Sequence, residues 1–198
     1  IEKLNNHLRI MTMPLSLPLR DRQLLHTRNI EVKGYIRPDN IYEIEGYVKD
    51  IRSNKYKNKW TEVPPGTPMH HMQARLAVDK NYVVKEIEVS SDFHPYPGIC
   101  NKIVSNFDVL VGCKIGGGWK KAIKEKLGGI KGCTHISELL LVPIATTAYL
   151  TIYLDNNDVA IEDSDEEIKP GFIDSCFALD SKGIVVEKQW SKFSNKKN

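Results

Sequence analysis

The first half of the chain carries two alternating patterns of apolar and polar residues, and each is interrupted by a short polar turn. One pattern covers residues 30–50 and turns at Pro38-Asp39-Asn40. The other covers residues 72–89 and turns at Asp79-Lys80-Asn81. A period of two is typical of strands that bury one face, and a turn between two such runs indicates an antiparallel hairpin. We therefore expect two antiparallel hairpins.

After residue 98 the apolar residues recur every three or four positions, which indicates helices. The spacing predicts a first helix over residues 99–111 and a second over residues 119–127. A third begins at Thr134, a typical N-cap residue, and Pro143 is expected to kink it. Because the strands come first and the helices follow, we expect an α+β fold, with an antiparallel sheet and three C-terminal helices packed on one of its faces.

The last third of the chain predicts one more hairpin, formed by residues 172–179 and 183–187. The acidic run at residues 162–167 is typical of an exposed loop. Met13 is a plausible natural start, so we interpret residues 1–12 as an extension. We expect a single domain over residues 13–190 and a basic tail over residues 191–198.

Composition narrows the classes of function. The chain has 198 residues, of which 41% are hydrophobic and 27% charged, and a net charge of +3, as in ordinary globular proteins. The Lys and Arg residues are dispersed, so we expect no nucleic-acid partner. The most apolar run, residues 139–152, is too short to cross a membrane. Four cysteines are too few for a disulfide scaffold, so we expect a reducing, cytoplasmic location.

Five potential metal ligands lie at the predicted junctions between strands and helices. Zinc and iron sites need two to four such nitrogen and sulfur donors that converge from separate elements. The alternatives are structural cysteines with unremarkable histidines, and a Cys133 nucleophile with His135 or His70 as its base. The five candidates are His70, His71, Cys100, Cys133 and His135.

Two aromatic residues near the same junctions are candidates for lining an apolar pocket. Tyr96 precedes the first predicted helix, and Trp119 opens the second. Single aromatic residues are more often part of the core. Tyr96 and Trp119 are therefore either pocket-lining residues or part of the core.

Short motifs occur in order along residues 14–190: Tyr42-Glu43-Ile44-Glu45-Gly46, Pro68-Met69-His70-His71-Met72, Tyr96-Pro97 with Cys100, Gly117-Gly118-Trp119, and Gly132-Cys133-Thr134-His135 with Glu138-Leu139-Leu140. This ordered set resembles the bacterial domain-of-unknown-function family 2889. The family's pattern has His-Asp-Met at the second motif, where this chain has His70-His71-Met72. The family carries no established reaction, so the resemblance informs the fold more than the function.

Residues 72–153 also resemble the NifU-like iron–sulfur assembly scaffold proteins, which hold metal with cysteines and a histidine or aspartate. Cys100 and Cys133 match two of the scaffold cysteines. The first scaffold cysteine has no counterpart, and His70 or His71 lies in its place. The resemblance therefore implies a single zinc or iron ion held by His70, Cys100, Cys133 and His135, with His71 as a substitute ligand.

These observations lead to one main hypothesis and two alternatives. The main hypothesis is a metal-dependent lyase or hydrolase that acts on a small apolar or aromatic molecule. One alternative is a non-enzymatic protein that handles or assembles metal or sulfur; the other is a structural adaptor with buried cysteines. We expect a small-molecule partner, no membrane and a possible homodimer.

Overall fold

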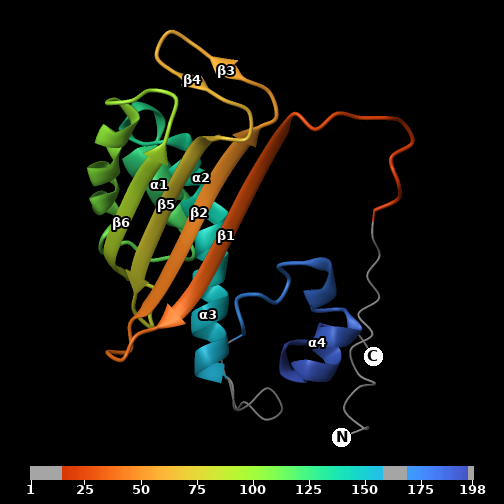
Figure 1. The fold of residues 1–198 in the computed structure, drawn as a ribbon. Helices are drawn as coiled ribbons and strands as arrows, with labels where there is room; N and C mark the ends of the chain where they lie inside the picture. The colour runs from red at the N-terminus through yellow and green to blue at the C-terminus, as the bar shows by residue number, and fades with distance from the viewer. Residues whose placement is uncertain (1–14, 158–168, 196–198) are drawn as a thin grey trace, which may run out of the picture.

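The computed structural model describes residues 15–157 and 169–195, and its centre is a four-stranded antiparallel sheet (Figure 1). The strand order is β1-β2-β5-β6. The predicted hairpins are confirmed: β1 (His26–Ile36) pairs with β2 (Tyr42–Arg52), and β5 (Pro68–Val78) pairs with β6 (Val84–Phe93). The α+β class is confirmed with them.

A small two-stranded ribbon lies between the two central strands in the sequence. Between β2 and β5, the strands β3 (Tyr56–Lys57) and β4 (Glu62–Val63) form a two-stranded antiparallel sheet that extends beyond the end of the main sheet (Figure 1). The following residues 64–68 contain three prolines, which cannot donate to a ladder. The ribbon thus ends before β5 begins.

Helices cover one face of the sheet. They are the 3₁₀-helix Cys100–Leu110, α1 (Trp119–Leu127), α2 (Thr134–Leu139), a π-helical turn (Leu140–Ile144) and α3 (Ala145–Asn157). A short 3₁₀-helix, Gly129–Lys131, joins α1 to α2. The inner face of the sheet and the helices bury one continuous core that includes Ile44, Val48, Met72, Leu76, Phe107, Ile123 and Ile144.

The central helical run begins at α2 and continues to the end of α3. Pro143, where the sequence predicts a kink, lies within a π-helical turn, because it cannot donate to the helical ladder. The N-cap is Cys133 rather than Thr134: Cys133 has an extended backbone, and its carbonyl accepts the N–H of Ser137 at 2.8 Å. The helix Thr134–Asp155 is long and apolar enough to cross a membrane by length and composition, but its inward face is buried in the core.

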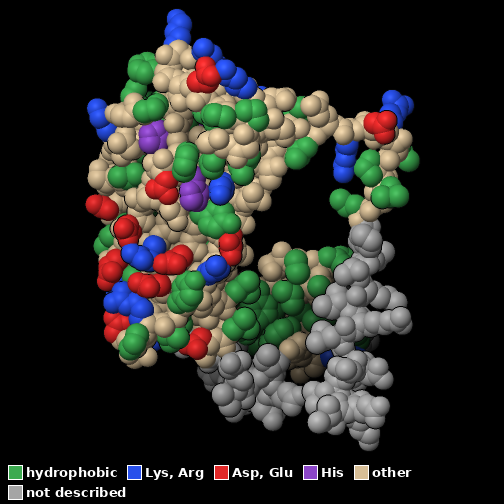
Figure 2. Space-filling view, viewed as in Figure 1, with side chains coloured by type: hydrophobic (Ala, Val, Ile, Leu, Met, Phe, Trp, Pro, Cys, Tyr) green, Lys and Arg blue, Asp and Glu red, His purple; other side chains and the backbone are tan. Residues whose placement is uncertain are grey.

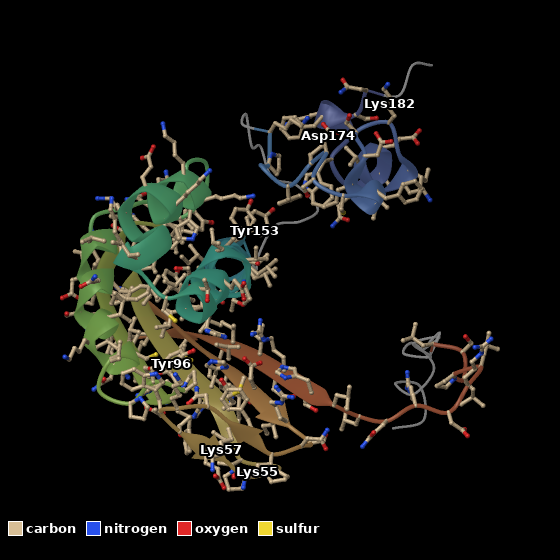
Figure 3. All side chains as sticks on the ribbon, turned by 90° about the horizontal axis from the view of Figure 1, so that it is seen from above. Lys55, Lys57, Tyr96, Tyr153, Asp174 and Lys182 are labelled. Carbon is tan, nitrogen blue, oxygen red and sulfur yellow. The ribbon has the colours of Figure 1, made fainter. Side chains whose placement is uncertain are left out.

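The prediction of a last hairpin is wrong. Residues Phe177–Leu179 form a 3₁₀-helix, and α4 covers Ile184–Gln189, followed by a 3₁₀-turn at Ser191–Phe193. A short apolar run does not distinguish a strand from a helix by periodicity alone, and here Gly183 provides a helix N-cap. Phe172 meets Tyr153 of α3 edge-on, with ring centroids 5.1 Å apart, which joins this segment to the core helix (Figure 3). The predicted loop 162–167 and extension 1–12 lie outside the described residues.

The outer face of the sheet is polar. Figure 2 shows acidic and basic side chains interleaved over the strands. Arg75 pairs with Glu45 at 3.3 Å and with Glu88, and Lys33 pairs with Glu31 at 3.1 Å. The two faces of the sheet therefore have opposite chemistry, and this difference makes any polar residue on the inner face notable.

Candidate metal centre

Among residues 15–157 and 169–195, the inner face of the sheet carries one buried carboxylate, Asp50, near the end of β2. The even-numbered residues of β2 face the helices, so Asp50 lies on the same side as Ile44 and Val48 and is only 1% exposed. The strand register places Arg28 of β1 directly beside it on one side and His70 of β5 on the other. Three neighbouring strands thus bring a cation, a carboxylate and an imidazole together.

Arg28 holds the Asp50 carboxylate with two hydrogen bonds. Its Nε donates to Oδ1 at 2.7 Å, and a terminal nitrogen donates to Oδ2 at 2.9 Å. His26 approaches Oδ1 at 3.2 Å, and Arg28 also donates to Glu138 of α2 at 3.1 Å. Burial alone raises the pKa of Asp50, but the hydrogen bonds and charge of Arg28 outweigh it and lower the pKa to about 2. Asp50 is therefore ionised at any ordinary pH.

Two stacked imidazoles face the other side of the carboxylate. His70 Nδ1 lies 3.2 Å from Asp50 Oδ2, and His135 Nε2, from the first turn of α2, lies 3.6 Å from the same oxygen. The two ring centroids are 3.9 Å apart, with an angle of 30° between the planes. The helix and the sheet therefore supply one imidazole each.

Both imidazoles are held in the neutral form. Burial lowers the pKa of His70 to about 4, and the neighbouring His135 adds to this effect, although Asp50 opposes it. Burial also lowers the pKa of His135, again against the influence of Asp50. Neutral imidazole is the form that binds metal ions. The site is thus a charged carboxylate beside two histidines ready to act as ligands.

The geometry of these three residues suits a metal ion. One ligand atom from each of Asp50, His70 and His135 lies within 4.8 Å of the other two. Bonds of about 2.0–2.1 Å in a tetrahedral arrangement separate neighbouring ligand atoms by about 3.3–3.4 Å. The distances of 3.2 and 3.6 Å from the Asp50 oxygen to the two imidazole nitrogens bracket this value. Asp50, His70 and His135 could therefore hold a metal ion.

The two cysteines proposed from the sequence lie beside this group and are not part of it. Cys133 Sγ is 3.9 Å from His135 Nδ1, the ring nitrogen that faces away from Asp50. Cys100 lies near Cys133: burial raises the pKa of the Cys100 thiol, and Cys133 adds to the rise. Both thiols are free. Of the four predicted ligands, the structure brings His70 and His135 together. Cys133 Sγ lies on the side of the His135 ring that faces away from Asp50.

The remaining candidates lie in other surroundings. His71 points to the outer face, where its Nδ1 is 3.5 Å from Asp92 and its ring meets Tyr47 edge-on. Tyr96 is 41% exposed and packs edge-on against Trp60, with ring centroids 6.4 Å apart (Figure 3). Trp119 is a core residue whose indole N–H donates to the carbonyl of Leu140 at 2.9 Å.

Sequence reasoning missed Asp50 and Arg28. An aspartate next to Ile51 at the end of a strand is usually a surface residue, so composition gave no reason to select it. One signal was present: the alternation that buries Ile44 and Val48 also places residue 50 on the inner face. The position of Arg28 beside Asp50 depends on the strand register, which the residues of one strand do not reveal.

A comparison with family models finds a match over more than half of the chain. Residues 26–150 match the model described as "Protein of unknown function (DUF2889)". This range includes β1 to β6 and all three residues of the candidate site. No curated protein and no solved structure matches. The likeness of residues 72–153 to NifU-like scaffolds therefore stays a prediction.

Proposed function

The chain belongs to the DUF2889 family, and from this premise we propose that Asp50, His70 and His135 bind one zinc or iron ion in a metal-dependent enzyme. The observation that carries the proposal is the convergence of three ligand atoms within 4.8 Å around a carboxylate that is 1% exposed. Two imidazoles and one carboxylate are a common donor set of catalytic zinc and of non-haem iron. In this proposal Asp50 takes the role that the sequence suggested for the cysteines.

The neighbours of the three ligands support the same assignment. A metal bound to His135 Nε2 requires the proton on Nδ1, and Cys133 Sγ at 3.9 Å is positioned to accept it. Arg28 fixes the orientation of the Asp50 carboxylate and leaves one side of Oδ2 facing the imidazoles. Three protein ligands leave at least one coordination position for water or substrate.

Such an open position would suit lyase or hydrolase chemistry. The ion would polarise a substrate carbonyl or lower the pKa of a bound water. A groove of about 270 Å³ lies beside Cys133, between α1 and α2. Its walls include the apolar Ile123, Leu127 and Leu141, so a small apolar or aromatic group bound there would lie next to Cys133, although none of the three proposed ligands lines the groove.

Metal titration of untagged, metal-free protein tests the proposal. We expect one Zn²⁺ or, without oxygen, one Fe²⁺ per chain, and loss of this binding in His70→Ala and His135→Ala. His71→Ala is the matched control because His71 lies on the outer face, and it should bind like the native protein. Absence of stoichiometric metal binding in the native protein would refute the site.

Turnover separates an enzyme from a carrier. An enzyme should convert small esters or carbonyl compounds, lose this activity with a chelator and regain it when the metal is restored. Stoichiometric binding without turnover, together with transfer of the ion to an acceptor protein, would favour the non-enzymatic alternative.

A second candidate function rests on the contact between Cys133 Sγ and His135 Nδ1. In it, Cys133 is a nucleophile, His135 takes its proton, and Asp50 near Nε2 orients the ring. The two candidates require opposite protonation of His135 Nδ1. A thiol enzyme would lose turnover in Cys133→Ser and keep full activity with a chelator. The metal enzyme would keep turnover in Cys133→Ser and lose activity with a chelator.

A further inference from the structure

The two edges of the main sheet are built differently, and this difference points to an interaction surface. At the β6 edge, the pairing with β5 shifts register near both ends. The segment after the 3₁₀-helix Cys100–Leu110 covers the start of this edge: Val84 donates to the carbonyl of Cys113 at 2.9 Å and accepts from Gly112 at 2.8 Å. Bulges and covering segments are two of the ways in which proteins protect a sheet edge.

The β1 edge has neither form of protection. All eleven residues of β1 pair with β2 without a register shift. Within the described part of the chain, β1 has no strand partner on its other side. Except for Thr27 and Val32, its residues are exposed. A long, regular and open edge is a template for pairing with another strand.

We infer that β1 pairs antiparallel with β1 of a second copy of this chain, about a two-fold axis at Val32. Charge favours this register over the two in which the axis moves by one residue. It places Glu31 of each copy opposite Lys33 of the other, so two attractive pairs form on the outer face. With the two-fold axis at residue 31, Glu31 would face Glu31 of the other copy. With the axis at residue 33, Lys33 would face Lys33. Both pairings are unfavourable.

The same register keeps the two sheets continuous. Residues opposite each other across an antiparallel pair share a face, so even-numbered residues of β1 meet even-numbered residues of the second copy. The helices of both copies then cover the same face of one eight-stranded sheet. A two-fold axis of this kind closes the assembly at two copies.

Exposed apolar side chains beside this edge support a second copy as the occupant. Ile30 and Ile36 of β1 are 45% and 52% exposed. The extended segment before β1 leads away from its own sheet (Figure 1), and it carries Leu15, Leu17 and Leu19 at 97%, 87% and 101% exposure. A second copy beside β1 lies on the side toward which this segment extends.

Sedimentation velocity of the native chain and of charge variants tests the inference. The native chain should sediment as a dimer at micromolar concentrations. Glu31→Lys and Lys33→Glu should each raise the dissociation constant of the dimer at least tenfold, because like charges then face each other twice. The double variant E31K/K33E restores opposite charges in the same register and should restore the dimer. Circular dichroism would verify that each variant is folded.

Mixing the two single variants tests the charge pairing most directly. Glu31→Lys has two lysines on the strand and Lys33→Glu has two glutamates, so an equimolar mixture should form a heterodimer although each alone is a monomer. A monomeric native protein, a dimer insensitive to the single variants, or a folded double variant that stays monomeric would each overturn the inference. Glu31 and Lys33 lie on the outer face, so this test is independent of metal binding at Asp50.

Discussion

His70 and His71 are neighbours in the chain, lie on opposite faces of the same sheet and each approach an aspartate. His70 Nδ1 is 3.2 Å from Asp50 on the inner face, and His71 Nδ1 is 3.5 Å from Asp92 on the outer face. The surroundings differ far more than the distances: the side chain of Asp50 is 1% exposed and that of Asp92 is 41% exposed. An identical pair of residue types is thus part of a candidate metal centre on one face and a solvent-exposed contact on the other.

The difference arises from what covers each face. On the inner face α2 brings His135 to within 3.6 Å of the Asp50 carboxylate, and the helices exclude water from it. On the outer face no described helix covers His71, so water competes with Asp92. Matched variants on the two faces therefore test whether burial causes this difference.

Removing the arginine on each face should give the largest contrast. Arg28→Ala leaves a buried carboxylate without its two-point partner, and we expect a loss of about 2–3 kcal/mol in the free energy of unfolding, below the usual range for a buried pair because Arg28 is partly exposed. Arg75→Ala breaks only exposed pairs on the outer face and should cost less than about 1 kcal/mol. Urea denaturation measures both, and equal losses would contradict the account.

Removing the charge of each aspartate should separate metal binding from surface electrostatics. Asp50→Asn takes an anionic ligand from the proposed ion, so we expect metal affinity to fall on the order of 100-fold. Asp92→Asn is the matched change on the outer face and should leave the affinity within about twofold. Competition with a chelating dye gives both affinities. A comparable loss in Asp92→Asn would place the ion elsewhere.

Acid should destabilise the metal-free protein between pH 6.5 and pH 4. The pKa of His70 is about 4 in the folded protein and about 6.5 in an unfolded chain, so the unfolded state binds more protons in this window. Stability present above pH 6.5 is then lost as the pH falls. Chemical denaturation across this range should show a shallower decline in His70→Asn. A native-like slope in that variant would show that His70 is not the group responsible.

The smallest expected effect concerns Cys133. Its sulfur accepts the Nδ1 proton of His135 in our proposal, so Cys133→Ala should weaken metal binding by about tenfold, within the range for a partner of a ligating histidine. Cys133→Ser keeps an acceptor at this position and should lose less. If sulfur were itself a ligand, both variants would abolish binding, and this outcome would favour the histidine–cysteine site suggested by the sequence.

The main sheet and the helical run from α2 to α3 could be predicted because each carries a local pattern of apolar residues. The alternation from Tyr42 to Val48 defines a strand with one buried face, and the spacing from Ile136 to Ile152 defines a helix with one buried face. Pro143 marks the irregular turn because it lacks an N–H. The prediction of a last hairpin was wrong because the apolar runs within residues 172–187 are too short for periodicity to distinguish a strand from a helix.

The candidate site was only half predictable. His70 and His135 were selected by residue type, and the register of β2 with β5 and the packing of α2 bring them together. Asp50 was not selected because an aspartate near a turn is common, and only its alternation with Val48 indicates the inner face. The sequence pattern also favours Cys133 as a ligand, but its sulfur lies beside Nδ1 of His135, the ring nitrogen that faces away from Asp50.

X-ray absorption spectroscopy of the zinc-loaded protein tests the central claim most directly, because it distinguishes nitrogen and oxygen ligands from sulfur. With Asp50, His70 and His135 as the protein ligands, the first shell should contain only nitrogen and oxygen at about 2.0–2.2 Å, with the outer-shell scattering of two imidazoles. A scatterer at about 2.3 Å would assign Cys100 or Cys133 to the ion and contradict the account.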